Sequence, residues 1–281
     1  MFNIEFHCDE KENFKKGYKA RALTYKDYSI EMHTHDFYEV NVVLAGSGTH
    51  CIENGRFKTT PGDVFVIPPN IAHAYCDTND LEVYHILLKK SFLSHNSSET
   101  KKVEGFLQLT EIEPILRSNF SNSYFLHLNR SQLELFKNET TFLNNSLFPW
   151  EENASMKYHT IWKILFWFSE MLSAQISTNQ GYSIQKNESQ IIKSLEYLHK
   201  NYAEKITIDT LAKEVFLSRS TFLRYFYNIC GTSPIEYLNN YRCKKAIELM
   251  ETKKFSKTEI AHNCGFYDLS HMERMLKKYN I

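Results

Sequence analysis

The fold is decided by Leu211-Ala212-Lys-Glu-Val-Phe-Leu-Ser218-Arg-Ser220-Thr-Phe222-Leu-Arg224-Tyr-Phe226, whose pattern recurs as Ile260-Ala261-His-Asn-Cys-Gly265-Phe-Tyr-Asp268-Leu-Ser270-His-Met272-Glu-Arg274-Met-Leu276. With one residue added in the second turn, the alanines, serines, arginines and apolar positions superimpose. Each copy has an aliphatic-alanine pair, a short turn, a capping residue and a second amphipathic segment, which is the pattern of a helix-turn-helix. Two such units in tandem predict a protein that binds DNA.

The second helix of each unit is expected to lie in the major groove with its first residues against the bases. Ser218 is a good N-cap, so the first of these helices should begin at Arg219, and Asp268 should cap the second. Apolar side chains at helical spacing, such as Phe222 and Phe226, should turn inward. The outward residues, which we expect to contact DNA, are Arg219, Ser220, Thr221 and Arg224 in the first unit and His271, Arg274, Lys277 and Lys278 in the second.

A helix expected over residues 234–250 joins the two units, with Pro234 in its first turn. About 18 helical residues span about 27 Å. That length would place the two groove helices about one DNA turn apart, on one face of the duplex.

The 281 residues carry no formal net charge, but the charges are unevenly distributed. Residues 189–281 hold 15 Lys and Arg against 10 Asp and Glu, whereas residues 1–188 hold 18 against 23. A modestly basic C-terminal third suits a DNA module attached to another domain. The sequence has no signal-peptide pattern and no long apolar run, so we expect a cytoplasmic protein without a membrane partner.

The six cysteines are scattered, with no CxxC spacing. This favours reduced thiols over a disulfide framework or a zinc ribbon. A redox sensor at Cys51 or Cys76 is a weaker alternative, because neither has an evident cationic neighbour or resolving partner in the sequence.

Residues 18–88 contain short β-type runs separated by Gly, Pro and the hairpin signal Asn54-Gly55, which predicts an antiparallel barrel or jelly roll. Helical spacing follows at 103–117, 131–146 and 156–176. The last helix has an apolar stripe that could form a dimer seam or could close the N-terminal core: Ile161, Leu165, Phe168 and Leu172.

The C-terminal third resembles the AraC/XylS family of bacterial transcription regulators. The resemblance covers about residues 190–279 and rests on many residue types at fixed spacings: Ile206, Leu211-Ala212, Ser218, Ser220, Arg224, Phe226, Gly231-x-Ser233-Pro234-x-x-Tyr237, Arg242, Ala246, Leu249, Ile260-Ala261, Gly265-Phe266, Asp268-x-Ser270, Arg274 and Lys277-Lys278. It implies a tandem helix-turn-helix domain that binds promoter DNA. It also implies a regulator that forms a homodimer and, if it is an activator, contacts RNA polymerase.

The chain departs from the family pattern at three points. Phe216 occupies a turn position that is often small, and Glu273 adds a negative charge beside Arg274. The sequence ends at Ile281, before the second closing segment that the family usually carries. We therefore expect the first unit to bind DNA more firmly than the second, with Arg219 and Arg224 as its main contributors.

The N-terminal part resembles cupins at His33-Thr-His35-x-x-x-Glu39, Pro61-Gly62-Asp63 and Pro68-Pro-Asn-Ile-Ala-His73. Alternate residues of a strand share one face, so His33 and His35 could enter the barrel together. Three histidines and a carboxylate suit Mn, Fe, Ni or Zn. Three interpretations remain open: a divalent metal site, an effector pocket without metal, and structural histidines. Arg21, in the arm before the barrel, is a further candidate for effector binding.

These patterns predict an α+β multidomain chain. Residues 1–176 form a cupin-like β-barrel with accessory helices, 177–188 a linker, and 189–281 an all-α tandem helix-turn-helix domain. The leading hypothesis is a transcription regulator whose barrel binds a small molecule, by resemblance a carbohydrate or related metabolite, with no cofactor beyond the metal left open above. The alternative is a metal-dependent cupin enzyme that uses His33, His35, Glu39 and His73 on iron or manganese.

Overall fold

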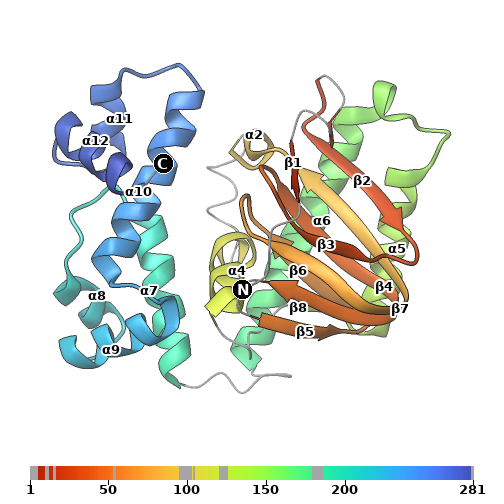
Figure 1. Cartoon of the computed structure of the whole chain (residues 1–281), viewed down its shortest axis with the longest axis horizontal. Coiled ribbons are helices and arrows are strands. Elements are labelled where there is room, and N and C mark those ends of the chain that lie inside the picture. The colour runs from red at the N-terminus through yellow and green to blue at the C-terminus, as the bar shows by residue number, and fades with distance from the viewer. Residues whose placement is uncertain are drawn as a thin grey trace. The chain divides into compact units, whose positions relative to one another are not determined.

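The computed structural model describes residues 6–9, 13–14, 17–52, 55–94, 103, 105–119, 126–178 and 186–279. The chain divides into two compact units, Met1–Ser183 and Ile184–Ile281, called here the sheet unit and the helical unit (Figure 1). Most of the expected linker, 177–188, lies outside the described residues.

The described part of the sheet unit contains one eight-stranded sheet. Its central path has the order β1-β3-β7-β4-β6-β8, while β2 pairs with β7 and β5 pairs with β4. All pairs are antiparallel except β1 with β3. The strands are β1 (Phe6–Cys8), β2 (Ala20–Tyr25), β3 (Ile30–His35), β4 (Tyr38–Ile52), β5 (Gly55–Thr59), β6 (Asp63–Ile67), β7 (His73–Leu88) and β8 (Leu126–His127).

Strand β4 is longer than the sequence pattern predicts, because it runs through the glycines that were expected to end it. Its register with β7 shifts between Val43 and Thr49, around Gly46. Gly46 has φ of 73°, and a Cβ there would lie 2.1 Å from the carbonyl oxygen of Asp80. Glycine therefore lets the long strand bend without ending it. The predicted hairpin signal includes Asn54, outside the described residues; Ile52 pairs with Gly55 across that gap.

Side chains of β4, β6 and β7 alternate between two sides of the sheet, as the strand repeat requires. One side packs against helices and is apolar: Val40, Val42, Val64, Val66, Tyr84, Ile86 and Leu88. The other, called here the interior side, buries polar groups among apolar ones: Glu39, Asn41, Asp63, Phe65, Val83 and His85. Because buried polar groups are costly unless they are paired, the interior side is where a functional site is expected.

Helices cover the apolar side of the sheet, with α5 and α6 lying along it (Figure 1). The stripe Ile161, Leu165, Phe168 and Leu172 of α6 is buried in this core, which decides between the two expectations for it: these four residues close the sheet unit. The helices are α2 (Lys90–Ser94), the π-helical η1 (Gln108–Ile112), α4 (Glu113–Asn119), α5 (Arg130–Asn144) and α6 (Trp150–Thr178). Among the described residues, no helix combines the length and apolarity needed to cross a membrane.

The helical unit contains two short helix pairs on either side of a long helix (Figure 1). Arg242 of the long helix is buried and donates from Nε to the carbonyl of Tyr202 and from Nη2 to the carbonyl of Glu204, both at 2.7 Å. The guanidinium therefore ties the long helix to the loop after α7. The helices are α7 (Lys186–Lys200), α8 (Ile208–Glu214), α9 (Arg219–Cys230), α10 (Pro234–Glu251), α11 (Lys257–Asn263) and α12 (Leu269–Lys278).

The duplication read in the sequence is present in the backbone. The amide of Leu217 donates to the carbonyl of Ala212, and the amide of Phe266 to the carbonyl of Ala261, both at 2.9 Å. These matching bonds close the α8–α9 and α11–α12 turns in the same way.

Candidate functional site

Five buried polar residues on the interior side form a group that we call the histidine cluster: His33, His35, Glu39, His73 and His85. Strand β3 contributes the first two because alternate residues share a face. His33 lies directly opposite His73 of β7 in the strand register, and the two rings are 4.2 Å apart. Each member is at most 4% exposed. Three strands therefore bring together all four residues of the predicted barrel site, and add a fifth.

Glu39 is the centre of the cluster. Its Oε2 lies 3.1 Å from Nε2 of His73 and 3.2 Å from Nε2 of His35, and its Oε1 contacts Nδ1 of His85. Burial alone would raise the pKa of Glu39, but the neighbouring imidazoles of His85, His35 and His73 outweigh it and hold that pKa well below its usual value. The carboxylate is therefore ionised in the folded protein.

Three of the histidines are fixed by the same backbone contact. Nδ1 of His33 lies 2.9 Å from the carbonyl oxygen of Glu31, and Nδ1 of His35 lies 2.7 Å from that of Phe37. Nδ1 of His73 is 3.1 Å from the carbonyl oxygen of residue 71. Since a carbonyl oxygen can only accept, each Nδ1 carries the proton and donates it.

Burial lowers the pKa of two of these rings, His33 and His73. Burial, followed by the nearby His73, lowers the pKa of His33 to about 4. Burial lowers the pKa of His73 too, although its contact with Glu39 opposes the change. Burial thus favours the neutral imidazole at His33 and His73, beside an ionised carboxylate.

Further polar groups extend the interior side beyond the cluster. His50 is fully buried, and neither of its ring nitrogens has a hydrogen-bond partner among the described residues. The same holds for Oδ1 of Asn41 and Nε2 of His85, while Nδ2 of Asn41 donates to the hydroxyl of Tyr75 at 3.4 Å. Buried polar atoms without partners are rare in folded proteins, and each costs about 1–3 kcal/mol.

Arg117 of α4 adds a buried positive charge near this side. Its guanidinium lies over the ring of Phe65, contacts the carbonyl of Val66 and is 3.4 Å from Glu113. Burial raises the pKa of Glu113 to about 7, although Arg117 opposes the change.

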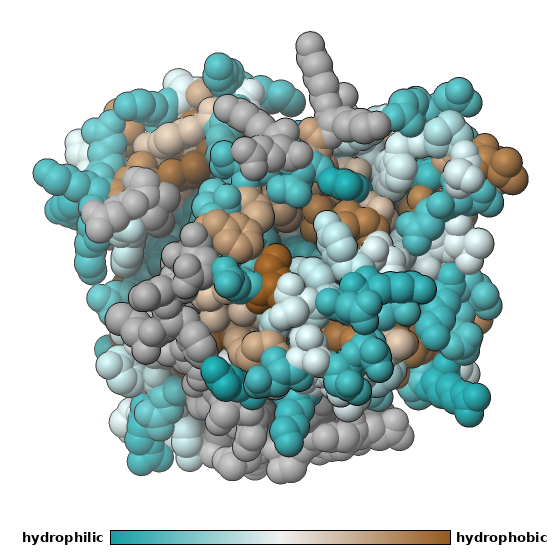
Figure 2. All heavy atoms as spheres, turned by 45° about the vertical axis from the view of Figure 1, so that its right-hand side comes forward, coloured by the Kyte–Doolittle hydropathy of each residue, from teal (hydrophilic) through white to brown (hydrophobic). Residues whose placement is uncertain are grey.

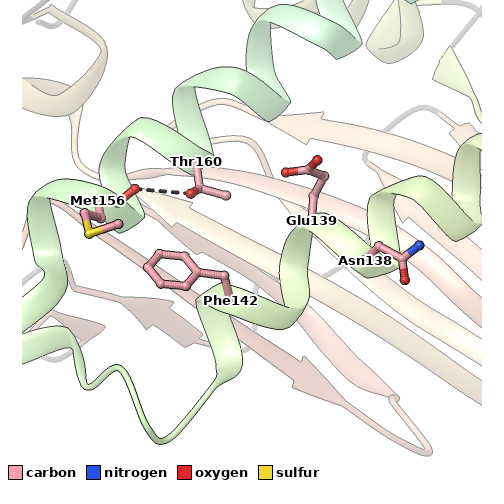
Figure 3. Close-up of a pocket in the computed structure, with 5 residues that line it drawn as sticks. All are labelled: Asn138, Glu139, Phe142, Met156 and Thr160. Atoms are coloured by element: carbon pink, nitrogen blue, oxygen red, sulfur yellow. Dashed lines mark hydrogen bonds between the residues drawn. The ribbon is translucent and has the colours of Figure 1, made fainter.

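Two surface hollows lie away from the histidine cluster. One, of about 370 Å³, lies between α5 and α6 and is lined by Asn138, Glu139, Phe142, Met156 and Thr160 (Figure 3). Its one drawn hydrogen bond runs from the Thr160 hydroxyl to the Met156 carbonyl, within α6. The other, of about 420 Å³, lies between the sheet and α5 beside Tyr84. Neither is lined by a member of the histidine cluster.

Helix α9 begins at Arg219 after the N-cap Ser218, as predicted. Phe222, Phe226 and Ile229 are buried, while the predicted DNA-contacting side chains of Arg219, Ser220 and Arg224 are exposed and Thr221 is half-buried. Arg219 forms a surface ion pair with Asp209 of α8 at 2.7 Å. Arg224 lies over the ring of its neighbour Tyr225.

Helix α12 begins after the N-cap Asp268, also as predicted. Arg274, Lys277 and Lys278 are exposed. His271 differs from the expectation: it is half-buried, its ring packs edge-on against Phe266, and burial lowers its pKa. Its imidazole is therefore a weaker candidate for a phosphate contact than the three cations.

Comparisons with known proteins identify both units. Residues 211–280 match a family model described as a helix-turn-helix domain, and residues 19–136 match an AraC-like ligand binding domain. The HTH-type transcriptional activator RhaS of Enterobacter sp. (strain 638) is 24% identical over 248 residues, which cover 88% of this chain and 83% of the relative. RhaS of Escherichia coli O1:K1 / APEC matches to the same extent. The chain belongs to the AraC family of transcription regulators.

Two solved structures from this comparison have low TM-scores. ToxT from Vibrio cholerae is 13% identical, with a TM-score of 0.37, over 94% of this chain and 96% of that one. The DNA-binding domain of AdpA in complex with a target DNA is 27% identical, with a TM-score of 0.31, over 32% of this chain and 80% of that one.

Membership of the AraC family decides between the two functions considered from the sequence. The relatives are transcription activators, and the chain is a DNA-binding regulator with a ligand-binding domain, not a cupin enzyme. 

The strand register places Arg21 on the same side of the sheet as the histidine cluster. Arg21 is exposed on β2 and donates to the carbonyl of Asn13 at 3.3 Å, whereas its neighbour Ala20 is buried in the apolar core. Strand alternation turns Arg21 away from that core, and Arg21 lies opposite Leu87, which lies opposite Glu39. The role of Arg21 in effector binding stays a prediction.

The structure brings together Cys51 and Cys76, the two cysteines considered for a redox sensor. Cys51 and Cys76 lie on neighbouring strands with their Sγ atoms 2.9 Å apart, so each has a thiol partner that the sequence did not reveal. Burial, with the Cys76 thiol beside it, raises the pKa of Cys51 to about 12. Cys51 is therefore a thiol and not a reactive thiolate at neutral pH.

Sequence reasoning missed His50 and His85 as interior residues. His85 alternates with Val83 and Leu87 in an otherwise apolar run, and His50 alternates with Ile52. Those patterns mark a polar side chain on a buried face. They do not say which strand pairs with which, and that pairing is what brings both residues to the same interior.

Proposed function

We propose that this AraC-family chain is a cytoplasmic transcription activator that binds a small hydroxyl-rich effector, a carbohydrate or related metabolite, inside the sheet unit. The observation that carries the proposal is the group of buried polar atoms without partners on the interior side, at His50, Asn41 and His85. Hydroxyl groups both donate and accept, so one polyhydroxy molecule can pair with imidazole and amide atoms together. The predicted residues His33, His35, Glu39 and His73 border the same interior.

The second half of the proposal concerns DNA. The exposed cations of α9 and α12 contact promoter DNA, and the effector changes how much of the promoter is occupied. Such coupling requires that the effector bind the DNA-competent conformation more tightly than the other. The RhaS relatives are named transcriptional activators, which favours activation over repression. As an activator, this chain would contact RNA polymerase.

We also propose that the chain acts as a homodimer. Large apolar side chains are exposed on and between α5 and α6, with Leu147 at 81% and Met156 at 61%. Figure 2 shows one face of the molecule, which is mostly hydrophilic with apolar side chains in small groups. Exposed apolar side chains that lie close together are typical of an interaction surface. Sedimentation of the purified protein should give twice the monomer mass, and Leu147→Glu should reduce that mass.

A melting experiment tests the effector site. All three tryptophans, Trp150, Trp162 and Trp167, belong to the sheet unit, so tryptophan fluorescence reports the unfolding of that unit. A panel of neutral pentoses and hexoses is added to the full chain. A sugar at 100 times its Kd stabilises the folded state by about 2.7 kcal/mol and should raise Tm by several degrees.

His50→Phe is the matched variant. It replaces two unpartnered nitrogens with carbon, so stability should stay or rise while the response to the sugar is lost. His159→Phe, at an exposed position on α6, is the control and should keep the response. If no sugar changes either Tm or operator binding, the carbohydrate assignment is wrong.

A further inference from the structure

The interior side holds a buried cation whose donors are not all paired. The side chain of Arg117 on α4 is 3% exposed. Its Nη2 contacts the carbonyl of Val66, but neither Nε nor Nη1 has a hydrogen-bond partner among the described residues. A guanidinium has five N–H donors, and burying it is costly unless acceptors pair with them. Arg117 therefore lacks an acceptor for part of its charge.

Glu113, one turn before Arg117 on α4, offsets this charge only in part. Its Oε1 lies 3.4 Å from Nε of Arg117, and neither atom has a hydrogen-bond partner among the described residues. Burial raises the pKa of Glu113 to about 7 although Arg117 opposes the change, so the carboxyl is often protonated at neutral pH. Two other acids of the interior side are already paired, Asp63 with His127 and Glu39 within the histidine cluster.

Arg117 and the proposed effector site meet at the ring of Phe65. The guanidinium carbon of Arg117 lies 5.2 Å from the centre of this ring, and the ring of His50 lies 4.4 Å from the same centre. Asn41 of β4 lies directly opposite Phe65 of β6 in the strand register. Burial, followed by the charge of Arg117, lowers the pKa of His50, so that charge acts on the site. The cation and the unpartnered atoms of His50 and Asn41 therefore surround one ring.

We propose that the effector is a sugar acid, a polyhydroxy molecule whose carboxylate pairs with Arg117 while its hydroxyl groups pair with His50 and Asn41. The inference rests on the proposed function and adds an acidic group to the effector. A carboxylate can accept from a guanidinium through two oxygens at once, whereas a neutral sugar offers no negative charge to it.

The balance of charge favours a carboxylate over a phosphate ester. One carboxylate carries a single negative charge, which matches the single positive charge of Arg117. A phosphate ester carries about −1.5 to −2 at pH 7. Its second charge would be buried without a cation to pair with, on the side that already holds the ionised Glu39.

Calorimetric titration of the full chain tests the preference. The probes are pairs that differ only at one carbon, galacturonate with galactose and glucuronate with glucose, and glucose 6-phosphate tests the phosphate ester. We expect the acid to bind at least about tenfold more tightly than its neutral partner, as one charge-assisted contact provides. A neutral sugar that binds as tightly as its acid would overturn the proposal, as would tighter binding of glucose 6-phosphate than of glucuronate.

Arg117→Met separates recognition of the acid from a structural role. It removes the charge and keeps the length of the side chain, so the acid should lose its preference while the neutral sugar keeps its Kd. Equal weakening of both probes, or an unchanged preference, would contradict the assignment. Lys157→Met is the matched control, because Lys157 is a buried cation of α6 that donates to the carbonyl of Leu143 at 2.8 Å. It should keep the preference.

The wild-type comparison needs no variant, so it decides even if a variant fails to fold. It also distinguishes the failure of this inference from that of the proposed function. If neutral sugars bind as tightly as their acids, the sugar-acid assignment falls and the proposed function stands. If neither acids nor sugars bind or change operator binding, the proposed function fails, and the sugar-acid assignment fails with it.

Discussion

The two helix-turn-helix units share a backbone but differ in their side chains. Both turns are closed by the same pair of hydrogen bonds, and both second helices begin after a side-chain N-cap. At the turn itself the backbone of each unit has a positive φ, 55° at Phe216 in the first and 76° at Gly265 in the second. Only glycine adopts this conformation at little cost. The helix-turn-helix fold therefore requires a left-handed backbone at this turn position, and it tolerates phenylalanine there although glycine suits it better.

The outward faces differ more than the turns. On α9 the first cation, Arg219, is paired with Asp209, whereas Arg224 has no acidic partner within the described residues. On α12 the acidic Glu273 is paired with Lys257 of α11 at 3.3 Å, and Lys278 with Glu236 of α10 at 3.4 Å. The ammonium group of Lys257 therefore partly offsets the negative charge of Glu273. These ion pairs are exposed and contribute little to stability, but they compete with phosphate for the same cations.

The largest expected effect comes from giving the second turn a side chain, as the first turn has. A Cβ at Gly265 would lie 2.5 Å from the carbonyl oxygen of Ala203, whereas Phe216 in the equivalent turn is 93% exposed. Gly265→Val should destabilise the helical unit by about 2–4 kcal/mol, from the clash and the positive φ together.

Urea unfolding of the full chain measures this change with two probes. Circular dichroism should show helices lost at lower urea, while tryptophan fluorescence, confined to the sheet unit, should keep its midpoint. An unchanged circular dichroism profile would mean that the two turns are equally tolerant.

The next effect concerns DNA binding. Arg224→Ala should weaken operator binding by about 1–3 kcal/mol if the side chain reads a base, and Arg274→Ala on α12 should cost less. Both arginines are exposed, so neither change should alter folding. A gel-shift assay at one fixed salt concentration, on an operator found by footprinting, gives both affinities. An equal or larger loss for Arg274→Ala would reverse the expected ranking of the two units.

The sequence predicts the DNA-binding unit well because its signals are local. A cap, a turn and an apolar spacing lie within a few residues of one another, so Ser218 and Asp268 could be assigned as N-caps without a structure. The interior of the sheet unit is different. His33, His35, Glu39 and His73 were found through a motif, whereas His50 and His85 enter by strand register, which the sequence does not contain.

Two further predictions show the same limit. The apolar stripe of α6 was equally compatible with a dimer seam and with the core, because a stripe does not name its partner. Arg21 was proposed as an effector contact from its place in the chain, and only the strand register shows that it lies opposite Leu87, which lies opposite Glu39.

The smallest effect is the reverse exchange in the first turn, Phe216→Gly. A non-glycine residue in the left-handed conformation destabilises the folded state by about 1–2 kcal/mol, and glycine removes that strain. Glycine also destabilises the folded state by about 0.5–1 kcal/mol, because the unfolded chain gains conformational entropy. Because the Phe216 side chain is 93% exposed, little packing is lost. The variant should therefore raise the free energy of unfolding of the helical unit by about 0.5–1 kcal/mol, seen as a later circular dichroism transition in urea. If it also weakens operator binding in the gel-shift assay, the exposed ring contacts DNA, and the first turn keeps phenylalanine for binding at a cost in stability.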